Sequence, residues 1–187
     1  MPHFLKFPFV LAACAILVAC TSLDPANESA PASETLGFQD WDSVSFHLSR
    51  SICFGACPSY IVEIKGDGTV NYCGRNFVKE IGKREDTIDK TEVKALFKKF
   101  KMAEFESLDD NYKARVTDLP SYDLRLAYDG KVKSVHDYGG SMIDMPPVVK
   151  DLEQAIDDTA NTAQWIGEAD EKQRATQRVE CDAEFDL

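Results

Sequence analysis

The chain is poor in positive charge, and it lacks the short motifs by which many enzymes are recognised. Its 187 residues include 21 Lys and Arg against 32 Asp and Glu, which gives a formal net charge of −11. Nucleic-acid binding needs clustered basic residues, so this balance argues against a nucleic-acid partner. The sequence contains no nucleophile elbow, phosphate-binding loop or zinc-binding helix motif. These absences favour a non-enzymatic protein and leave catalysis as an open alternative.

Long apolar segments are also missing, apart from one run at residues 7–19. This run is too short to span a bilayer, which takes about 20 apolar residues. It follows Lys6 and ends in small residues, a pattern typical of a secretory signal peptide. The tetrapeptide LVAC at residues 17–20 resembles a bacterial lipobox. We therefore expect residues 1–19 to be a signal peptide and Cys20 to be lipidated, in preference to LAAC at residues 11–14, which has a shorter apolar stretch before it.

A lipidated Cys20 implies a membrane anchor of more than one acyl chain, because a single chain holds a protein only marginally. Thr21 follows, where an aspartate would indicate retention at the inner membrane. We therefore expect the outer membrane, with the domain facing the periplasm or the cell surface. Residues 20–40 are rich in Ser, Ala, Pro and Glu, a composition that cannot bury enough surface to fold. They are expected to form a disordered tether before a domain at 41–167 and an acidic tail at 168–187.

Alternating apolar residues predict strands in the first half of the domain. Residues 43–49 alternate, with His47 on the polar face, where we expect it to meet solvent. Residues 60–64 and 70–72 alternate on either side of Gly66-Asp67-Gly68. A three-residue loop keeps their apolar side chains on one face, whereas a two-residue loop would divide them between two faces. We therefore expect the three-residue hairpin.

The rest of the domain indicates further strands and two helices. The candidates are weak strands at 77–81 and 84–88, a helix with an Asp89/Glu92 capping box that runs to 103, a strand pair at 122–128 and 132–138, and a helix after Pro146-Pro147, with Trp165 and Ile166 closing the core. This order predicts an α+β fold. We expect an antiparallel sheet of about five to six strands with two helices packed on one face. Residues 107–119 show no clean period, and so long a connection is a candidate functional loop.

Four cysteines remain in the expected mature domain: Cys53, Cys57, Cys73 and Cys181. In an oxidising compartment an even number of cysteines suggests disulfides. In the expected hairpin Cys73 lies opposite Ile61, roughly 13 Å along the strand from Cys57, which is too far for a bridge. We expect the pairs Cys53–Cys57 and Cys73–Cys181, and Cys53–Cys73 stays open as an alternative if the chain folds back.

The C-x-x-x-C-P spacing of Cys53 and Cys57 resembles the copper site of the Sco family of copper chaperones, in which a distant histidine joins two thiolates. Thiolates suit Cu(I), and His136 is the candidate third ligand. That resemblance implies a strand–helix junction in a thioredoxin-like fold, whereas the residues after Pro58 alternate into a hairpin. A structural disulfide is therefore the leading interpretation, and copper binding or thiol exchange is the alternative.

His136 has two alternative environments. A two-residue loop at residues 129–130 pairs it with Asp123 on an exposed face. A three-residue loop at residues 129–131 pairs it with Leu124 and turns it toward the core. In both cases a structural role is favoured over a catalytic one.

Three stretches of the domain resemble one bacterial family. They are CFGACPSYIVEIKGDGTVNYCG (residues 53–74), TDLPSYDLRLAYDGKVKSVHDYGG (residues 117–140), and PPVVKDLEQAID with the later WI (residues 146–157 and 165–166). They are similar to the family named domain of unknown function 6438, over about residues 41–166. The resemblance implies an envelope lipoprotein module without an assigned activity. Cys73 and Cys181 look like additions to the family pattern.

We therefore expect a lipid-anchored envelope protein that acts as a binding or structural module, without a cofactor. Its contact surface is expected at residues 53–60 and 107–119, where it would meet another envelope protein. The alternative is a copper- or thiol-handling protein that uses Cys53, Cys57 and His136. A hydrolase using the region of Asp118 is a third hypothesis.

Overall fold

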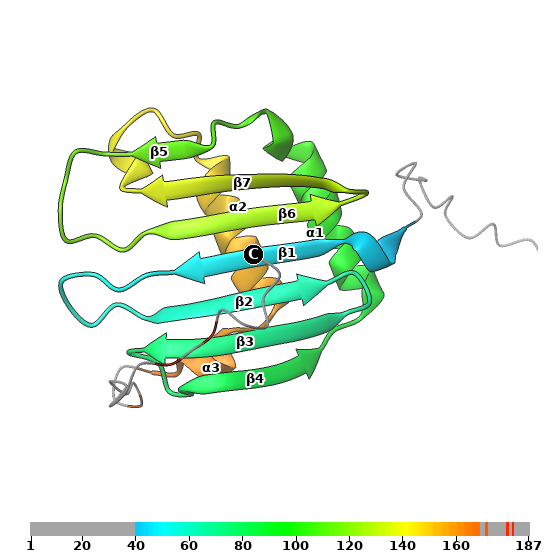
Figure 1. Cartoon of the computed structure of the whole chain (residues 1–187), viewed down its shortest axis with the longest axis horizontal. Helices are drawn as coiled ribbons and strands as arrows, with labels where there is room; N and C mark the ends of the chain where they lie inside the picture. Colours follow the sequence, from blue (N-terminus) through cyan, green and yellow to red (C-terminus); the bar gives the residue numbers. More distant parts are fainter. Residues whose placement is uncertain (1–39, 169–170, 172–178, 180, 182–187) are drawn as a thin grey trace, which may run out of the picture. The chain divides into compact units, whose positions relative to one another are not determined.

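A computed structural model describes residues 40–168, 171, 179 and 181. These residues form one seven-stranded sheet with three α-helices behind it (Figure 1). The strands are β1 (Ser45–Arg50), β2 (Ser59–Lys65), β3 (Thr69–Asn76), β4 (Gly82–Thr87), β5 (Asn111–Lys113), β6 (Tyr122–Tyr128) and β7 (Lys131–Tyr138), and the helices are α1 (Lys90–Met102), α2 (Val148–Thr159) and α3 (Ala163–Ile166). Short 3-10 turns lie at Trp41–Ser43, Phe105–Ser107 and Gly140–Met142. The strand order is β4-β3-β2-β1-β6-β7-β5.

The expected α+β class is confirmed, but the expected element count was too low. The short strand β5 pairs in parallel with β7 inside the stretch that showed no period. Only one of its three residues, Tyr112, is buried, so no alternation could reveal it. Residues 77–81 are not a strand, because the backbone N–H groups of Lys79 and Glu80 donate instead to Ile166 and Trp165 at 2.9 Å. That contact attaches α3, the helix that the sequence did not predict, to the turn between β3 and β4.

The β2–β3 hairpin has the three-residue register expected from the sequence. Ile64 lies opposite Val70, and Val62 lies opposite Tyr72. The turn requires glycine for steric reasons: a Cβ on Gly68, whose φ is +99°, would lie 2.3 Å from the carbonyl oxygen of Ile88. The hairpin thereby directs its apolar side chains toward the helices.

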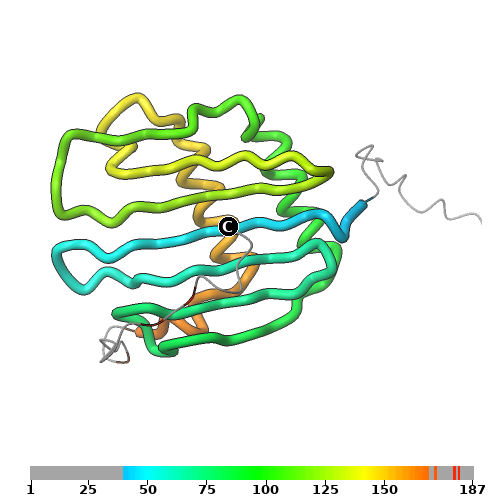
Figure 2. The backbone as a smooth tube through the Cα atoms, viewed as in Figure 1, coloured from blue at the N-terminus to red at the C-terminus, as the bar shows by residue number. Residues whose placement is uncertain are grey.

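The main core lies between the sheet and the two long helices, α1 and α2 (Figure 2). Helix α1 begins with the expected capping box, in which the side chain of Glu92 accepts a hydrogen bond from the backbone N–H of Asp89 at 3.2 Å. Its buried stripe includes Phe100, whose ring centroid is 5.1 Å from that of Phe46 on β1. Within the described part of the chain, no helix is long and apolar enough to cross a membrane.

The other face of the sheet is partly covered, and this overturns one expectation. His47 is only 5% exposed, although its place on the polar side of the β1 alternation predicted a solvent-facing side chain. On the same face, Ile61 and Cys73 pack with Val179 and Cys181 near the C-terminus. Alternation within one strand separates two faces, but it does not reveal that a distant segment packs on the second face.

Several expectations lie outside the described residues. These are the signal peptide at 1–19, lipidation at Cys20, most of the tether at 20–40 and most of the tail at 168–187. They stay predictions.

Candidate functional site

A row of polar side chains crosses the sheet at the end where β1 finishes. The register places Arg50 on β1 directly opposite Tyr60 on β2 and Tyr122 on β6, and Tyr122 lies opposite Asp137 on β7. Arg50 follows Phe46 and Leu48 at intervals of two, so it lies on the core face of β1. The row therefore faces α2 rather than solvent.

Arg50 is held by an ion pair and two aromatic rings. Its Nη2 donates to Oδ2 of Asp157 on α2, and the two side chains are 20% and 8% exposed. Its guanidinium carbon lies 4.7 Å from the ring centroid of Tyr122 and 5.7 Å from that of Tyr60. A desolvated cation over an aromatic ring is stabilised by about 2 kcal/mol. The geometry fixes the guanidinium between two strands and one helix.

Asp157 is the hub of this network. Its Oδ1 accepts hydrogen bonds from the Tyr60 hydroxyl at 2.7 Å and the Thr162 hydroxyl at 2.8 Å, while Oδ2 accepts from Arg50. Burial, with the negative charge of Asp157 beside it, raises the pKa of Tyr60 well above its usual range. Tyr60 therefore stays a neutral donor to Asp157, and the buried carboxylate is fully compensated.

A second charged group, which includes the buried carboxyls of Asp137 and Glu153, continues the row. The Nζ atom of Lys150 on α2 lies 3.8 Å from the Tyr122 ring centroid, 2.5 Å from Oδ2 of Asp137 and 2.9 Å from Oε2 of Glu153. Glu153 is only 3% exposed, and burial raises its pKa to about 7 against the opposing effect of Lys150. Residues 150, 153 and 157 are spaced three and four apart, so they share one face of α2.

A pocket of about 430 Å³ opens beside Arg50. It is lined by Arg50, Cys57, Pro58, Tyr60, Pro120, Tyr122, Gln154, Asp157, Asp158, Asn161, Thr162, Ala163 and Ile166. Its volume falls in the range of about 300–1,000 Å³ that is common for small-ligand sites. The pocket combines a charged floor with two tyrosines and two prolines, so it offers a ligand both polar and apolar contacts.

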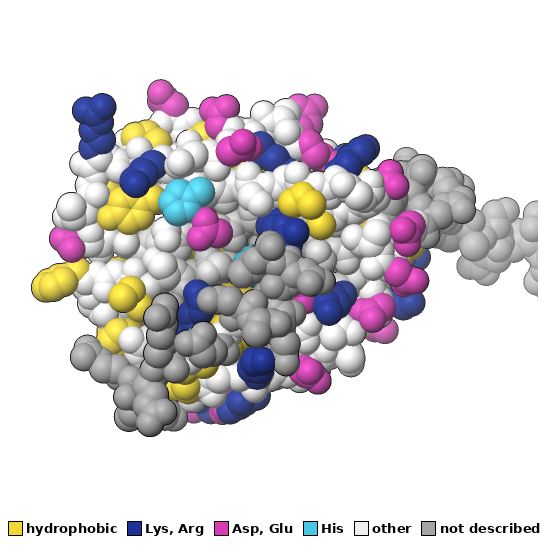
Figure 3. Space-filling model, in the orientation of Figure 1, with side chains coloured by type: hydrophobic (Ala, Val, Ile, Leu, Met, Phe, Trp, Pro, Cys, Tyr) yellow, Lys and Arg dark blue, Asp and Glu magenta, His cyan; other side chains and the backbone are white. Residues whose placement is uncertain are grey.

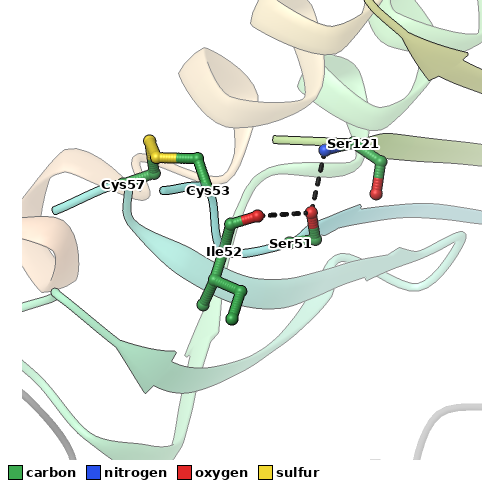
Figure 4. The surroundings of a disulfide bond; sticks show 5 residues. All are labelled: Ser51, Ile52, Cys53, Cys57 and Ser121. Atoms are coloured by element: carbon green, nitrogen blue, oxygen red, sulfur yellow. Dashed lines mark hydrogen bonds between the residues drawn. A yellow bond between two sulfur atoms is a disulfide. The ribbon is translucent and has the colours of Figure 1, made fainter. Parts of the chain in front are cut away.

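One wall of the pocket is formed by Pro58 and by Cys57, the last residue of the 53–57 loop, which a disulfide closes. The Cα atoms of Cys53 and Cys57 are 5.6 Å apart. The side chain of Ile52 points away from the bridge (Figure 4), and Ile52 is 56% exposed. Phe54, inside the loop, is 88% exposed. The loop therefore presents apolar side chains to solvent from a covalently closed turn.

Hydrogen bonds attach this loop to the connection between β5 and β6. Ser121 donates its backbone N–H to the Ser51 hydroxyl at 2.8 Å (Figure 4), and the backbone N–H of Ser51 donates back to the Ser121 carbonyl at 3.0 Å. The backbone N–H of Phe54 donates to the carbonyl of Asp118 at 3.1 Å. One residue of each predicted contact segment, Phe54 and Asp118, is thus joined at one end of the sheet. Figure 3 shows apolar side chains at that end.

The second disulfide joins Cys73 on β3 to Cys181, with Cα atoms 5.9 Å apart. Both bridges have the pairing expected from the sequence. His136 lies with its Nδ1 2.6 Å from Oδ1 of Asp123 on the exposed side of the β6–β7 hairpin. The two-residue loop is therefore correct, because Tyr128 pairs with Lys131, and the alternative that turned His136 toward Leu124 is wrong.

The structure does not bring the candidate metal ligands together. Among the residues that it describes, no three His, Cys, Asp or Glu side chains are grouped as ligands of a metal ion would be. His136 is engaged with Asp123 instead. Asp118, at the centre of the hydrolase hypothesis, accepts a hydrogen bond from the Thr117 hydroxyl at 2.8 Å.

Sequence reasoning missed the polar row. It took Tyr60 as a core residue and gave no role to Arg50, Lys150, Glu153 or Asp157. A signal was present, because Arg50 continues the core-facing positions of β1, and the acids lie beside the apolar stripe of α2. Their partners, however, lie up to 107 residues away.

A family model described as domain of unknown function (DUF6438) covers residues 44–160, which include the whole polar row and the 53–57 loop. The comparison with curated proteins found no match.

Proposed function

Since the chain belongs to the family described as domain of unknown function (DUF6438), we propose that it is a lipid-anchored bacterial envelope protein whose domain binds a protein partner. The binding surface is the end of the sheet formed by the 53–57 loop and the β5–β6 connection that is hydrogen-bonded to it. The anchor is Cys20, through the lipobox pattern at residues 17–20.

One observation carries this proposal: Phe54 is 88% exposed within a loop that a disulfide closes and hydrogen bonds brace. An exposed aromatic side chain on a rigid support can bind with little loss of conformational freedom. Burying such a side chain contributes about 1.5–3 kcal/mol. A turn that served only to connect β1 to β2 would have no need to expose phenylalanine.

The placement of the loop leaves it accessible to a protein partner. Trp41 precedes β1, and the 53–57 loop follows it, so the two lie at opposite ends of that strand (Figure 1). A tether that joins the domain near Trp41 leaves Phe54 at the far end of the sheet from its attachment point. The two disulfides also suit the oxidising envelope.

Photo-crosslinking in intact cells tests this proposal. A benzophenone amino acid at position 54 should give a discrete adduct with one envelope protein. The matched control is position 102, where Met102 is 75% exposed at the end of α1, away from the loop. Replacing both cysteines of the short bridge by serine should weaken the adduct. Equal labelling from positions 54 and 102, or no adduct from 54, would contradict the proposal.

A further inference from the structure

We propose that the pocket beside Arg50 holds a short peptide segment, with Arg50 donating a hydrogen bond to a main-chain carbonyl oxygen of that segment. This rests on the proposed function, because the segment belongs to the partner, and it specifies how the partner is bound.

Arg50 has hydrogen-bonding capacity to spare. A guanidinium carries five N–H donors. Among the described residues, the Arg50 side chain makes one hydrogen bond, from Nη2 to Asp157. Its Nε is buried and has no hydrogen-bond partner in that part of the chain. The side chain lines the pocket and is 20% exposed, so guanidinium donors other than the buried Nε–H are available to a bound acceptor.

The charges around the pocket favour a neutral acceptor. Asp157 already balances the charge of Arg50. Glu153 acts electrostatically on Arg50, and the exposed carboxylate of Asp158 also lines the pocket. Because Asp157 pairs with Arg50 and Asp158 adds a negative charge, the pocket offers no excess positive charge to a carboxylate or phosphate. A peptide carbonyl carries no charge and can accept the hydrogen bond.

The remaining lining matches the other parts of a peptide. The Gln154 amide donates to Oδ1 of Asp158 at 2.8 Å, which leaves Oδ2 as an acceptor for a peptide N–H. Pro58, Pro120 and Ile166 offer apolar surface to one side chain of the segment. The pocket thus contains a donor, an acceptor and an apolar wall, which together specify a peptide more closely than a hydrocarbon or an anion.

The test is a titration followed by NMR, on the full mature chain carrying Cys20→Ser so that it stays in solution. The probes are acetyl-Gly-Leu-Gly-amide and the same peptide with a free carboxyl end, each up to about 10 mM, enough to detect a millimolar dissociation constant. The amide signals of Tyr60, Thr162 and Ala163 should shift and saturate with the end-blocked peptide. Ala163→Trp should fill the pocket and weaken binding by about tenfold or more.

Gln164→Trp is the matched control, because residue 164 is an exposed neighbour outside the pocket lining. It should leave binding unchanged. The proposal is overturned if the end-blocked peptide gives no saturable shift, if only the free acid binds, or if binding survives Ala163→Trp. A cross-link from position 54 that persists in Ala163→Trp would keep the proposed function and reject the pocket as its peptide site.

Discussion

Replacing Glu153 by glutamine should change the pH dependence of stability in a predictable direction. Glu153 lies on the buried face of α2 with Lys150, Asp137 and Arg50 as its charged neighbours. Burial raises its pKa to about 7 from its usual value of 4.5. Each pKa unit corresponds to about 1.4 kcal/mol, so ionising this group in the folded protein costs about 3 kcal/mol.

The direction of the pH effect on stability follows from proton binding. The folded state binds the Glu153 proton more tightly than the unfolded state, so protonation stabilises the fold. This contribution is complete below about pH 4.5 and is lost as the pH rises to about 7. A glutamine resembles the protonated acid in shape and charge. Glu153→Gln should therefore match the wild type at about pH 4.5 and be more stable by about 3 kcal/mol at about pH 8.

Urea unfolding of the oxidised protein at those two pH values measures this difference. Glu85→Gln is the control, because Glu85 is an exposed carboxylate on β4 and its replacement should give equal shifts at both pH values. If Glu153→Gln were instead destabilising by the same amount at both pH values, Glu153 would be an ionised partner of Lys150 throughout, and the reasoning would be refuted.

Three further changes have defined outcomes. Cys20→Ala should abolish incorporation of labelled palmitate and release the protein from the membrane fraction, whereas Cys14→Ala should do neither. Arg50→Ala should destabilise the domain by about 3–5 kcal/mol in urea unfolding because it leaves a buried carboxylate unpaired, and Arg50→Lys should cost less; equal losses would mean that the charge is unimportant. Cys181→Ser should lower stability by about 5 kcal/mol in the chain-entropy model, and an unchanged unfolding midpoint would show that the long bridge does not constrain the unfolded chain.

The sequence was sufficient where one local pattern determined the outcome. Alternation chose the register of the β2–β3 hairpin, because a slip of one residue would reverse every side chain. It left the β6–β7 loop open between two and three residues, and the structure decided for two. The capping box located the start of α1. Spacing along the β2–β3 hairpin was also enough to separate Cys57 from Cys73.

The sequence was insufficient where burial depends on residues far along the chain. Arg50 looks like a polar residue at the end of a strand. Its ion-pair partner, Asp157, which holds it in the pocket floor, lies 107 residues later in the chain. His47 looks solvent-facing until Val179 and Cys181 are found on its side of the sheet. The site therefore escaped local reasoning, although the exposed loop beside it did not.

The long disulfide also affects what a protease could do to the domain. Every element from β4 to α3 lies between Cys73 and Cys181. A single cut in any connection between those cysteines would leave two pieces joined by the bridge. A cut inside the 53–57 loop would be held in the same way by the short bridge. Such a nicked domain would run as one band without reductant and as two with it, and it could keep its sheet assembled after its chain had been broken.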